Sequence, residues 1–476
     1  MRILDDDISF LQNVKGDSSY LNYYYTTLFY GKTKLPQTFI LDTGSAITTS
    51  PCEKCNKCGS HLNPKFKLEN ESKIIGCNTD NCNLVRNSIC SFNRCTFFNS
   101  YSEGSSLSGF YIDQDVFFEE IDNEYNLTNV SYSIPVGCTT SENHLFKTQL
   151  ADGIMGLNNN DKSFVSILYN LKVIQKNIFS LCFSQEGGYF SIGKVATSHH
   201  FSKNISYVSL LGKNSGNYYI ELKYIQIGDK KILYNGRSFV DSGTTISYFP
   251  ERQFSQIMTL FFEECKNRTC GELRRIKGLG YCAHVKFEAE VEEIINNGWR
   301  NIIIGFDGFD FIWKPENYYF RYNTESNGKN ICLGFEGDKR YNILLGTTFM
   351  HGHDIIFDKQ DNRVGFVPAD CERNLNLENK IDENIKIEDI NNNRTQTFNE
   401  DNKLLTDVDV NKNEDNKIIK EINNNTDVIK SDKVNDNIII SDNSINKSNS
   451  NIITNINKNK DENKIISDIG IHKINN

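Results

Sequence analysis

The sequence predicts an all-β protein built from two lobes, with a few short helices. Patterns typical of strands are short and close together, and Gly, Asn and Asp turns separate them. A weak internal duplication also divides the chain, because FILDTGSA at 39–46 returns as FVDSGTT at 239–245, and DGIMGL at 152–157 returns as NILLGTT at 342–348. The same order of motifs in both halves predicts two lobes of similar construction.

The internal duplication and a change in composition after Cys371 divide the 476 residues into four expected segments. Residues 1–19 are an N-terminal extension, and residues 20–195 are a first β lobe, with a cysteine-rich insert at 51–95 and a hairpin at 96–112. Residues 196–371 form the second β lobe. The remainder, 372–476, consists almost entirely of Asn, Asp, Lys, Glu, Ile and Ser. We predict that this tail is disordered because it buries too little apolar surface to offset its ordering entropy, although its Ile residues are compatible with a transient helix on a partner.

Two stretches show helical rather than strand periodicity. The first is 161–174, and its apolar positions are Phe164, Ile167, Leu168 and Leu171. The second is 251–265, and its apolar positions are Phe254, Ile257, Met258, Phe261 and Phe262. We predict that both are amphipathic helices packed on a sheet.

Charge and cysteine usage indicate the class of protein and its compartment. A formal net charge of −9 and the absence of a basic, aromatic-rich patch argue against nucleic-acid binding, and no apolar run is long enough for a membrane span. All fourteen cysteines lie between Cys52 and Cys371. Five sequons precede the tail, and they begin at Asn70, Asn126, Asn129, Asn204 and Asn267. We therefore expect disulfides, glycosylation and a location in the secretory pathway, in the endoplasmic reticulum lumen, with the signal peptide outside this sequence.

The insert holds half of the cysteines, and they have two possible uses. These seven are Cys52, Cys55, Cys58, Cys77, Cys82, Cys90 and Cys95. They offer ligands for zinc or an iron–sulfur cluster, with His61 as an additional ligand, or they form disulfides, which we favour. An odd number leaves one over, for which Cys138 is the candidate partner. The other disulfide candidates are Cys182, Cys265, Cys270, Cys282, Cys332 and Cys371.

Two other features suggest metal or ligand binding but have plainer explanations. His351 and His353 in MHGHD resemble a metal-binding pair, yet they precede a strand pattern, and we expect a structural role. Trp299 and Trp313 are expected to pack in the core or on the surface. We expect no metal and no cofactor.

The duplicated acidic turns point to acid–base chemistry. Asp42 and Asp241 each end an apolar run on a turn that contains Gly44 or Gly243. If the lobes bring the two carboxylates together, they cannot both ionise cheaply, so one keeps a proton while the other acts as a base. Such a pair can activate a water and protonate the oxygen of an amide.

Small hydroxyl residues surround both carboxylates. Thr43 and Ser242 are placed to form hydrogen bonds across the lobes. Ser45 and Thr244 are placed to bond the outer carboxylate oxygens.

These motifs, together with SYSEGSSLSGFYIDQDV and the segment from 342 to 367, resemble those of the pepsin-like aspartic proteases over residues 20–371. The insert after the first turn is similar to that of the nepenthesin-type branch and its apicomplexan relatives. The resemblance implies a bilobal β fold with Asp42 and Asp241 as the catalytic pair. It also implies a flap hairpin that carries Tyr101 and Gly104, and two ψ-shaped loops around Gly156 and Gly346.

The resemblance further implies a specificity. Glu103 and Gln149 match the positions that read an arginine in the substrate, which implies cleavage of secretory or exported proteins at Arg-x-Leu motifs. The substrate is an extended polypeptide between the lobes, and the enzyme is expected to be a monomer. The alternatives are a broad-specificity secreted protease and a non-catalytic binding protein on the same fold.

Overall fold

The computed structural model describes residues 9–68, 73–101, 103–120, 126–324, 328–339 and 342–372. The sequon at Asn70 and the tail beyond residue 372 lie outside the described residues, so the predictions made for them stay predictions. The same is true of the first eight residues of the N-terminal extension. Within the described part, no helix is long and apolar enough to cross a membrane.

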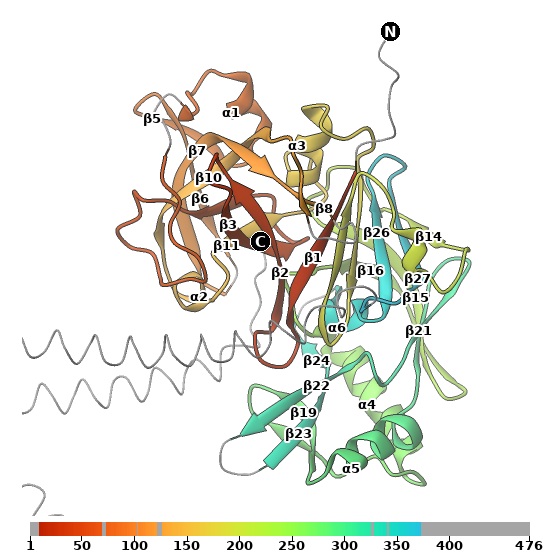
Figure 1. The fold of residues 1–476 in the computed structure, drawn as a ribbon. Coiled ribbons are helices and arrows are strands. Elements are labelled where there is room, and N and C mark those ends of the chain that lie inside the picture. Colours follow the sequence, from red (N-terminus) through yellow and green to blue (C-terminus); the bar gives the residue numbers. More distant parts are fainter. Residues whose placement is uncertain are drawn as a thin grey trace, which may run out of the picture. The chain divides into compact units, whose positions relative to one another are not determined.

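The fold is mostly β, as the sequence predicted, and its largest sheet has fourteen strands (Figure 1). In spatial order they are β14 (Ser206–Ser209), β27 (Arg363–Pro368), β26 (His353–Asp358), β12 (Ile178–Phe183), β13 (Glu186–Ile192), β1 (Phe10–Asp17), β2 (Tyr23–Tyr30), β3 (Leu35–Asp42), β11 (Gly153–Gly156), β4 (Thr48–Pro51), β10 (Tyr132–Glu142), β7 (Ser106–Phe117), β6 (Arg94–Ser100) and β5 (Ser88–Ser91). Strands from both halves of the chain share this sheet, so it joins the two lobes.

The second lobe adds two sheets of its own. The seven-stranded sheet has the order β21 (Asp310–Trp313), β20 (Ile302–Gly305), β15 (Tyr218–Ile227), β16 (Lys230–Val240), β25 (Ile343–Leu345), β17 (Ser247–Pro250) and β24 (Phe335–Asp338). The four-stranded sheet has the order β18 (Leu273–Ile276), β19 (Gly280–Val285), β23 (Gly328–Leu333) and β22 (Tyr319–Thr324). A two-stranded sheet of the first lobe pairs β8 (Glu119–Glu120) with β9 (Asn126–Leu127).

The internal duplication reappears as the same strand arrangement in both lobes. In the first lobe, β11 lies parallel to β3 and antiparallel to β4, and β4 is parallel to β10. In the second, β25 lies parallel to β16 and antiparallel to β17, and β17 is parallel to β24. Each acidic turn therefore follows a strand that a short ψ-loop strand supports in parallel register.

The helices are few, and most of them are short. Their bounds are α1 (Asp80–Leu84), α2 (Leu145–Thr148), α3 (Phe164–Asn170), α4 (Glu251–Cys265), α5 (Glu288–Glu293) and α6 (Thr347–Met350), with a 3₁₀ turn η2 (Thr197–His199) and a π turn η3 (Ile294–Gly298). Figure 1 shows α4 and α5 together at the lower end of the second lobe.

The two predicted helices form, with two differences from the prediction. Helix α3 is shorter than 161–174 and ends before Lys172, whose φ of 60° is left-handed. Helix α4 has the predicted bounds and buries Phe254, Ile257, Met258 and Phe261. Phe262, by contrast, is 39% exposed, because its ring lies against the edge of Tyr281 at the surface rather than in the core.

Residues 10–17, which the sequence placed in the N-terminal extension, form β1 between β13 and β2. Phe10 and Val14 alternate with Leu11 and Asn13 and are buried. The ring of Phe10 stacks on Phe118 at 4.0 Å. The described part of the first lobe therefore begins at this strand.

All fourteen cysteines form disulfides. The pairs are Cys52–Cys138, Cys55–Cys58, Cys77–Cys90, Cys82–Cys95, Cys182–Cys371, Cys265–Cys270 and Cys282–Cys332. Cys138 pairs with a cysteine of the insert, as predicted. A disulfide sulfur has no thiolate to offer a metal, so the zinc and iron–sulfur alternatives do not apply to these residues.

Candidate active site

The two acidic turns lie at the same relative place in the two lobes. Asp42 ends β3, and its carbonyl accepts a hydrogen bond of 2.8 Å from Leu157 N, just after β11. Asp241 follows β16, and its own N–H donates to Leu345 O of β25 at 2.9 Å. Backbone bonds to the ψ-loop strands thus hold both turns. The glycines of these loops permit the close packing, since a Cβ at Gly156 or Gly346 would meet the backbone of Ala46 or Ile246.

Reciprocal hydrogen bonds lock the two turns together across the lobes. Ser242 Oγ accepts from Thr43 N at 3.0 Å, and Thr43 Oγ1 accepts from Ser242 N at 2.8 Å. Each hydroxyl then donates to the strand of the opposite lobe, Ser242 Oγ to Leu41 O at 2.7 Å and Thr43 Oγ1 to Val240 O at 3.3 Å. The two turn residues and the two strand residues concerned are buried, so these bonds form away from water. The predicted role of Thr43 and Ser242 is therefore seen in the structure.

The carboxylates of Asp42 and Asp241 meet between the glycines of their turns. A Cβ on Gly44 would lie 2.8 Å from Asp241 Oδ1 and 3.0 Å from Asp42 Oδ1. A Cβ on Gly243 would lie 2.7 Å from Asp42 Cγ. Only glycine leaves room for the opposite carboxylate at either position. The glycine N–H groups also bind the carboxylates, because Gly44 N donates to Asp42 Oδ1 at 2.7 Å and Gly243 N to Asp241 Oδ1 at 3.0 Å.

The environment of Asp42 favours its protonated form. Burial raises the pKa of Asp42 well above its ordinary value, and the charge of Asp241 raises it further. The Ser45 hydroxyl and the Gly44 amide offset part of this increase. Two buried carboxyl groups that interact in this way share one proton over a wide pH range.

The outer oxygens of the two carboxylates differ in their hydrogen bonds. Thr244 Oγ1 donates to Asp241 Oδ2 at 2.7 Å, as predicted. Asp42 Oδ2 and Ser45 Oγ are buried, and within the described residues neither has a hydrogen-bond partner of good geometry. The Ser45 hydroxyl nevertheless acts on Asp42 as a hydrogen-bonding group that lowers its pKa, in the direction expected from the sequence.

The flap is the hairpin of β6 and β7, and its turn places Tyr101 beside Asp42. Tyr101 N donates to Ser105 O at 2.8 Å, and Gly104 N donates to Tyr101 O at 3.0 Å. Gly104 adopts a left-handed φ of 99°, which glycine tolerates. Tyr101 is buried, and burial followed by the Asp42 charge raises its pKa. The phenol therefore lies within the electrostatic reach of the dyad.

The two residues expected to read an arginine occupy separate segments. Glu103 lies on the flap turn, is partly buried, and raises the pKa of nearby Tyr101. Gln149 ends α2 and is 9% exposed, and its Nε2 donates to Ala151 O at 3.1 Å. The Gln149 side chain is thus engaged with its own loop.

The sequence did not predict several residues of the segment that follows β10. The ring of Phe146 in α2 lies 5.0 Å from the Tyr101 ring, and it is buried. Asp152 accepts hydrogen bonds from Thr38 and Asn63 and so fixes the start of the ψ loop. The Asp-Gly pair at 152–153 was a signal for this role, but nothing in the sequence marks Phe146.

The remaining sequence candidates are structural. His351 is buried between Tyr24 Oη at 2.8 Å and Asn317 O at 3.1 Å, and His353 packs against Phe311 with ring centroids 4.3 Å apart. Trp299 and Trp313 are buried, and both lie against Tyr318. These arrangements agree with the structural roles expected from the sequence.

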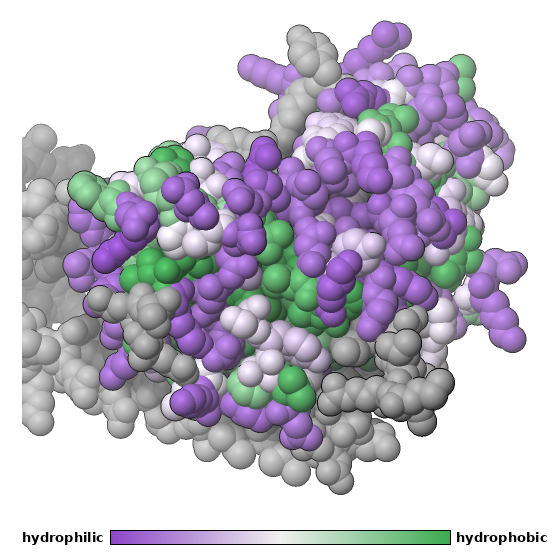
Figure 2. All heavy atoms as spheres, turned by 90° about the horizontal axis from the view of Figure 1, so that it is seen from above, coloured by the Kyte–Doolittle hydropathy of each residue, from purple (hydrophilic) through white to green (hydrophobic). Residues whose placement is uncertain are grey.

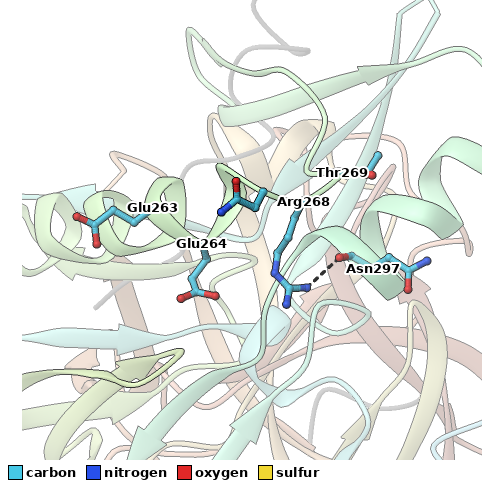
Figure 3. Close-up of a pocket in the computed structure, with 6 residues that line it drawn as sticks. Glu263, Glu264, Arg268, Thr269 and Asn297 are labelled. Atoms are coloured by element: carbon cyan, nitrogen blue, oxygen red, sulfur yellow. Dashed lines mark hydrogen bonds between the residues drawn. The ribbon is translucent and has the colours of Figure 1, made fainter.

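A polar hollow in the second lobe does not include the dyad (Figure 3). Its lining residues are Glu263, Glu264, Asn267, Arg268, Thr269 and Asn297. Arg268 donates to Asn297 O at 3.0 Å across it, as the dashed line in Figure 3 shows. The hollow contains the exposed sequon at Asn267, in the loop that Cys265–Cys270 closes.

The surface shows no single apolar face in the view of Figure 2, where hydrophobic side chains lie in separate groups among hydrophilic ones. The most exposed large hydrophobic residues of the described part are likewise scattered over several elements, among them Tyr20, Phe92, Phe201 and Leu233.

Comparison with known proteins identifies the family. Residues 24–194 match the family description "Xylanase inhibitor N-terminal", and residues 217–368 match "Xylanase inhibitor C-terminal". The chain is 28% identical to Plasmepsin V of Plasmodium falciparum (isolate 3D7), with 76% of this chain and 73% of that protein covered. It is 24% identical to Aspartic protease 5 of Toxoplasma gondii, with 73% and 36% covered. It is 23% identical to Aspartic proteinase nepenthesin-2 of Nepenthes gracilis, with 70% and 74% covered.

A solved structure supports the fold. Basic 7S globulin from soybean superposes with a TM-score of 0.60 at 14% identity, covering 76% of this chain and 95% of that chain. At this identity the likeness concerns the fold alone. The sequence matches and the duplicated turns agree with one another, and the chain belongs to the pepsin-like family of aspartic proteases.

Proposed function

We propose that this protein is an aspartic endopeptidase that uses Asp42 and Asp241 to hydrolyse peptide bonds. The observation that carries the proposal is a pair of buried acidic turns, one from each lobe, joined by reciprocal hydrogen bonds. Because the pKa of Asp42 is raised, the pair holds one proton where ordinary carboxylates have lost theirs. The protonated carboxyl donates to the substrate carbonyl oxygen while the ionised one takes a proton from water.

The surroundings of the dyad suit this reaction. Asp42 Oδ2 and Tyr101 Oη are both buried without a hydrogen-bond partner of good geometry in the described part of the chain. A bound group can satisfy buried polar atoms of this kind. A water on the dyad and a peptide under the flap supply such partners. Tyr101 would then cover an extended polypeptide in the space between the lobes.

We further propose that the substrates are secretory proteins with an Arg-x-Leu motif, cleaved after the leucine. The partly buried carboxylate of Glu103 on the flap supports this, since it can receive a guanidinium through two charge-assisted hydrogen bonds. Similarity to Plasmepsin V supports the same specificity. Seven disulfides support a location in the secretory pathway, which we place in the endoplasmic reticulum lumen.

One competing function is a binding protein without catalysis. The family descriptions that match both halves of the chain name inhibitors, which favours this alternative. Against it, the chain retains both aspartates, both turn glycines and the flap tyrosine. Catalysis is therefore the better explanation of the site.

The test is the cleavage of two matched peptides that contain Arg-x-Leu or Ala-x-Leu. The wild-type protein, with its disulfides formed, is expected to prefer the arginine peptide. Asp42→Asn is expected to lose activity, and Glu103→Ala to lose the preference. Glu272→Ala is a matched control, because the Glu272 side chain is 76% exposed and pairs with Arg274. Equal cleavage of the two peptides would reject the arginine specificity, and no cleavage at all would favour the binding protein.

A further inference from the structure

The first loop of the cysteine-rich insert is fastened to a segment that contacts the flap. We call residues 142–152 the α2 segment, because they contain α2 and join β10 to β11. Lys57 O accepts from Glu142 N at 3.2 Å, and Leu62 N donates to Leu150 O at 2.9 Å. Gly59 N donates to Glu142 Oε2 at 3.0 Å. Three hydrogen bonds therefore join the insert loop to the α2 segment.

His61 lies at the centre of this contact and touches both ends of the α2 segment. Its Nε2 is 3.1 Å from Glu142 Oε2, and its Nδ1 is 3.0 Å from the carbonyl oxygen of Gln149. The side chains of His61 and Glu142 are only 3% and 2% exposed. The imidazole therefore bridges Glu142, the first residue of the α2 segment, and Gln149, the residue that follows helix α2. The ring is almost completely shielded from solvent.

The partners of His61 determine its protonation state. A carbonyl oxygen only accepts hydrogen bonds, and so does an ionised carboxylate. Both ring nitrogens must then donate, and only the imidazolium ion carries two N–H groups. A neutral imidazole would have to give up one of the two contacts. With Glu142 as a carboxylate, the complete bridge thus requires a positive charge on His61.

The α2 segment connects this bridge to the flap. Phe146 projects from α2 and is buried, with its ring centroid 5.0 Å from that of Tyr101. Leu145 N also donates to Ser105 Oγ of the flap turn at 3.2 Å. A change in the position of the α2 segment would therefore change the surface on which the flap residues rest.

We propose that His61 is a positioning residue whose protonated ring clamps the α2 segment against the insert, so that its protonation controls how tightly the enzyme binds substrate under the flap. This inference rests on the proposed protease function. His61 contacts neither the dyad nor the flap itself, so it acts through the α2 segment. Binding, measured as KM, should follow its charge, whereas the chemical step should not.

The other charged groups around His61 leave Glu142 as its direct counter-ion. Asp152 also acts on His61 electrostatically, but its carboxylate is bound by Thr38 and Asn63. Lys57 lies on the insert loop and Lys147 on the α2 segment, and each contacts the opposite segment through backbone atoms. The Tyr23 hydroxyl accepts from Leu150 N and Ala151 N.

The direction of the pH effect follows from these contacts. Burial alone would lower the pKa of His61, but the hydrogen bond and charge of Glu142, the Gln149 carbonyl and the charge of Asp152 together outweigh it, and the pKa lies above the usual 6.5. A base whose pKa is raised on folding contributes stability below its unfolded pKa and loses it as the pH rises through the folded one. With Glu142 ionised, the clamp is therefore complete near pH 6.5, and it opens as the pH rises through the folded pKa of His61.

Two measurements on the full disulfide-bonded protein test the clamp. The first is an NMR titration of labelled histidines, which needs no substrate. His61 is expected to titrate above pH 6.5 in the wild type, and Glu142→Gln should lower its pKa by about one unit or more. The second is the pH dependence of KM and kcat with the cleaved peptide. KM should rise several-fold as the pH passes the folded pKa, and Glu142→Gln should move this rise to lower pH.

Matched variants separate the clamp from a general loss of structure. His61→Gln should raise KM and remove its pH step while kcat stays within about twofold of the wild type. His284→Gln should change neither constant, because His284 is exposed on β19. Titration of His61 at or below pH 6.5, or an unchanged KM profile in Glu142→Gln and His61→Gln, would overturn the clamp. Failure of the wild type to cleave any peptide would overturn the protease function instead, and the histidine titration would still decide the state of His61.

Discussion

The substitution Gly243→Ala is expected to displace the Asp42 carboxylate without disturbing the backbone. Gly243 is not among the left-handed glycines, so alanine can adopt its conformation. The added Cβ, however, would lie 2.7 Å from Asp42 Cγ and closer still to Asp42 Oδ1, whereas ordinary contacts begin at 3.4 Å. Asp42 must therefore move by about 1 Å, which is the scale at which misplacement costs about a hundredfold in rate. That factor corresponds to about 2.7 kcal/mol in the activation free energy.

The assay compares kcat/KM and thermal unfolding for Gly243→Ala, Gly76→Ala and the wild type. Overpacking should cost Gly243→Ala about 1–3 kcal/mol of stability, so the protein should still be folded during the assay. Gly76→Ala is the matched control, because the nearest atom to its new Cβ would be 3.6 Å away and its backbone is not left-handed. A kcat/KM for Gly243→Ala within twofold of the wild type would refute the placement of Asp42 against Gly243.

Two further predictions concern stability. Asp42→Asn should raise the free energy of unfolding near neutral pH, because a carboxyl whose pKa rises on folding destabilises the native state as the pH increases above its unfolded value of 3.8. The gain should vanish below about pH 4, and an Asn variant less stable than the wild type at pH 7 would contradict it. Replacing Cys52 and Cys138 together by Ala should lower the free energy of unfolding in urea by about 2–5 kcal/mol, since their disulfide closes a loop with a sequence separation of 86. A loss below about 1 kcal/mol would show that the insert is held by its hydrogen bonds alone.

The sequence predicted the parts of the site that repeat. Thr43 and Ser242 hold equivalent places in two similar turns, so a cross-lobe bond between them followed from the duplication alone. The ψ-loop strands were predictable for the same reason, because two apolar residues and a glycine recur in the same order after each turn. Two copies of a pattern in the same order are hard to obtain by chance, whereas a single Asp-Thr-Gly is common in turns and would not have supported these conclusions.

The parts that do not repeat could not be predicted. His61 was considered only as a spare metal ligand, since nothing local indicates that it meets Glu142 and the Gln149 carbonyl more than eighty residues later. Seven cysteines in one insert permit many pairings, so only the need for an outside partner was evident. Strand β1 was missed because Gln12 is polar yet buried, its Nε2 donating to Glu119 O at 2.8 Å, which hides the alternation typical of a strand.

The two halves of the site differ in what holds them, and this separates their responses to pH. The dyad is positioned by backbone amides and by the hydroxyls of Thr43 and Ser242, none of which titrates near neutral pH. The α2 segment is positioned in part by His61, whose imidazole titrates near neutral pH. A change of pH between 6 and 8 should therefore alter the geometry under the flap while it leaves the turns in place. Consequently kcat should report the shared proton of Asp42 and Asp241, and KM should report the charge of His61. The two pH profiles should differ in midpoint even though both arise within one active site.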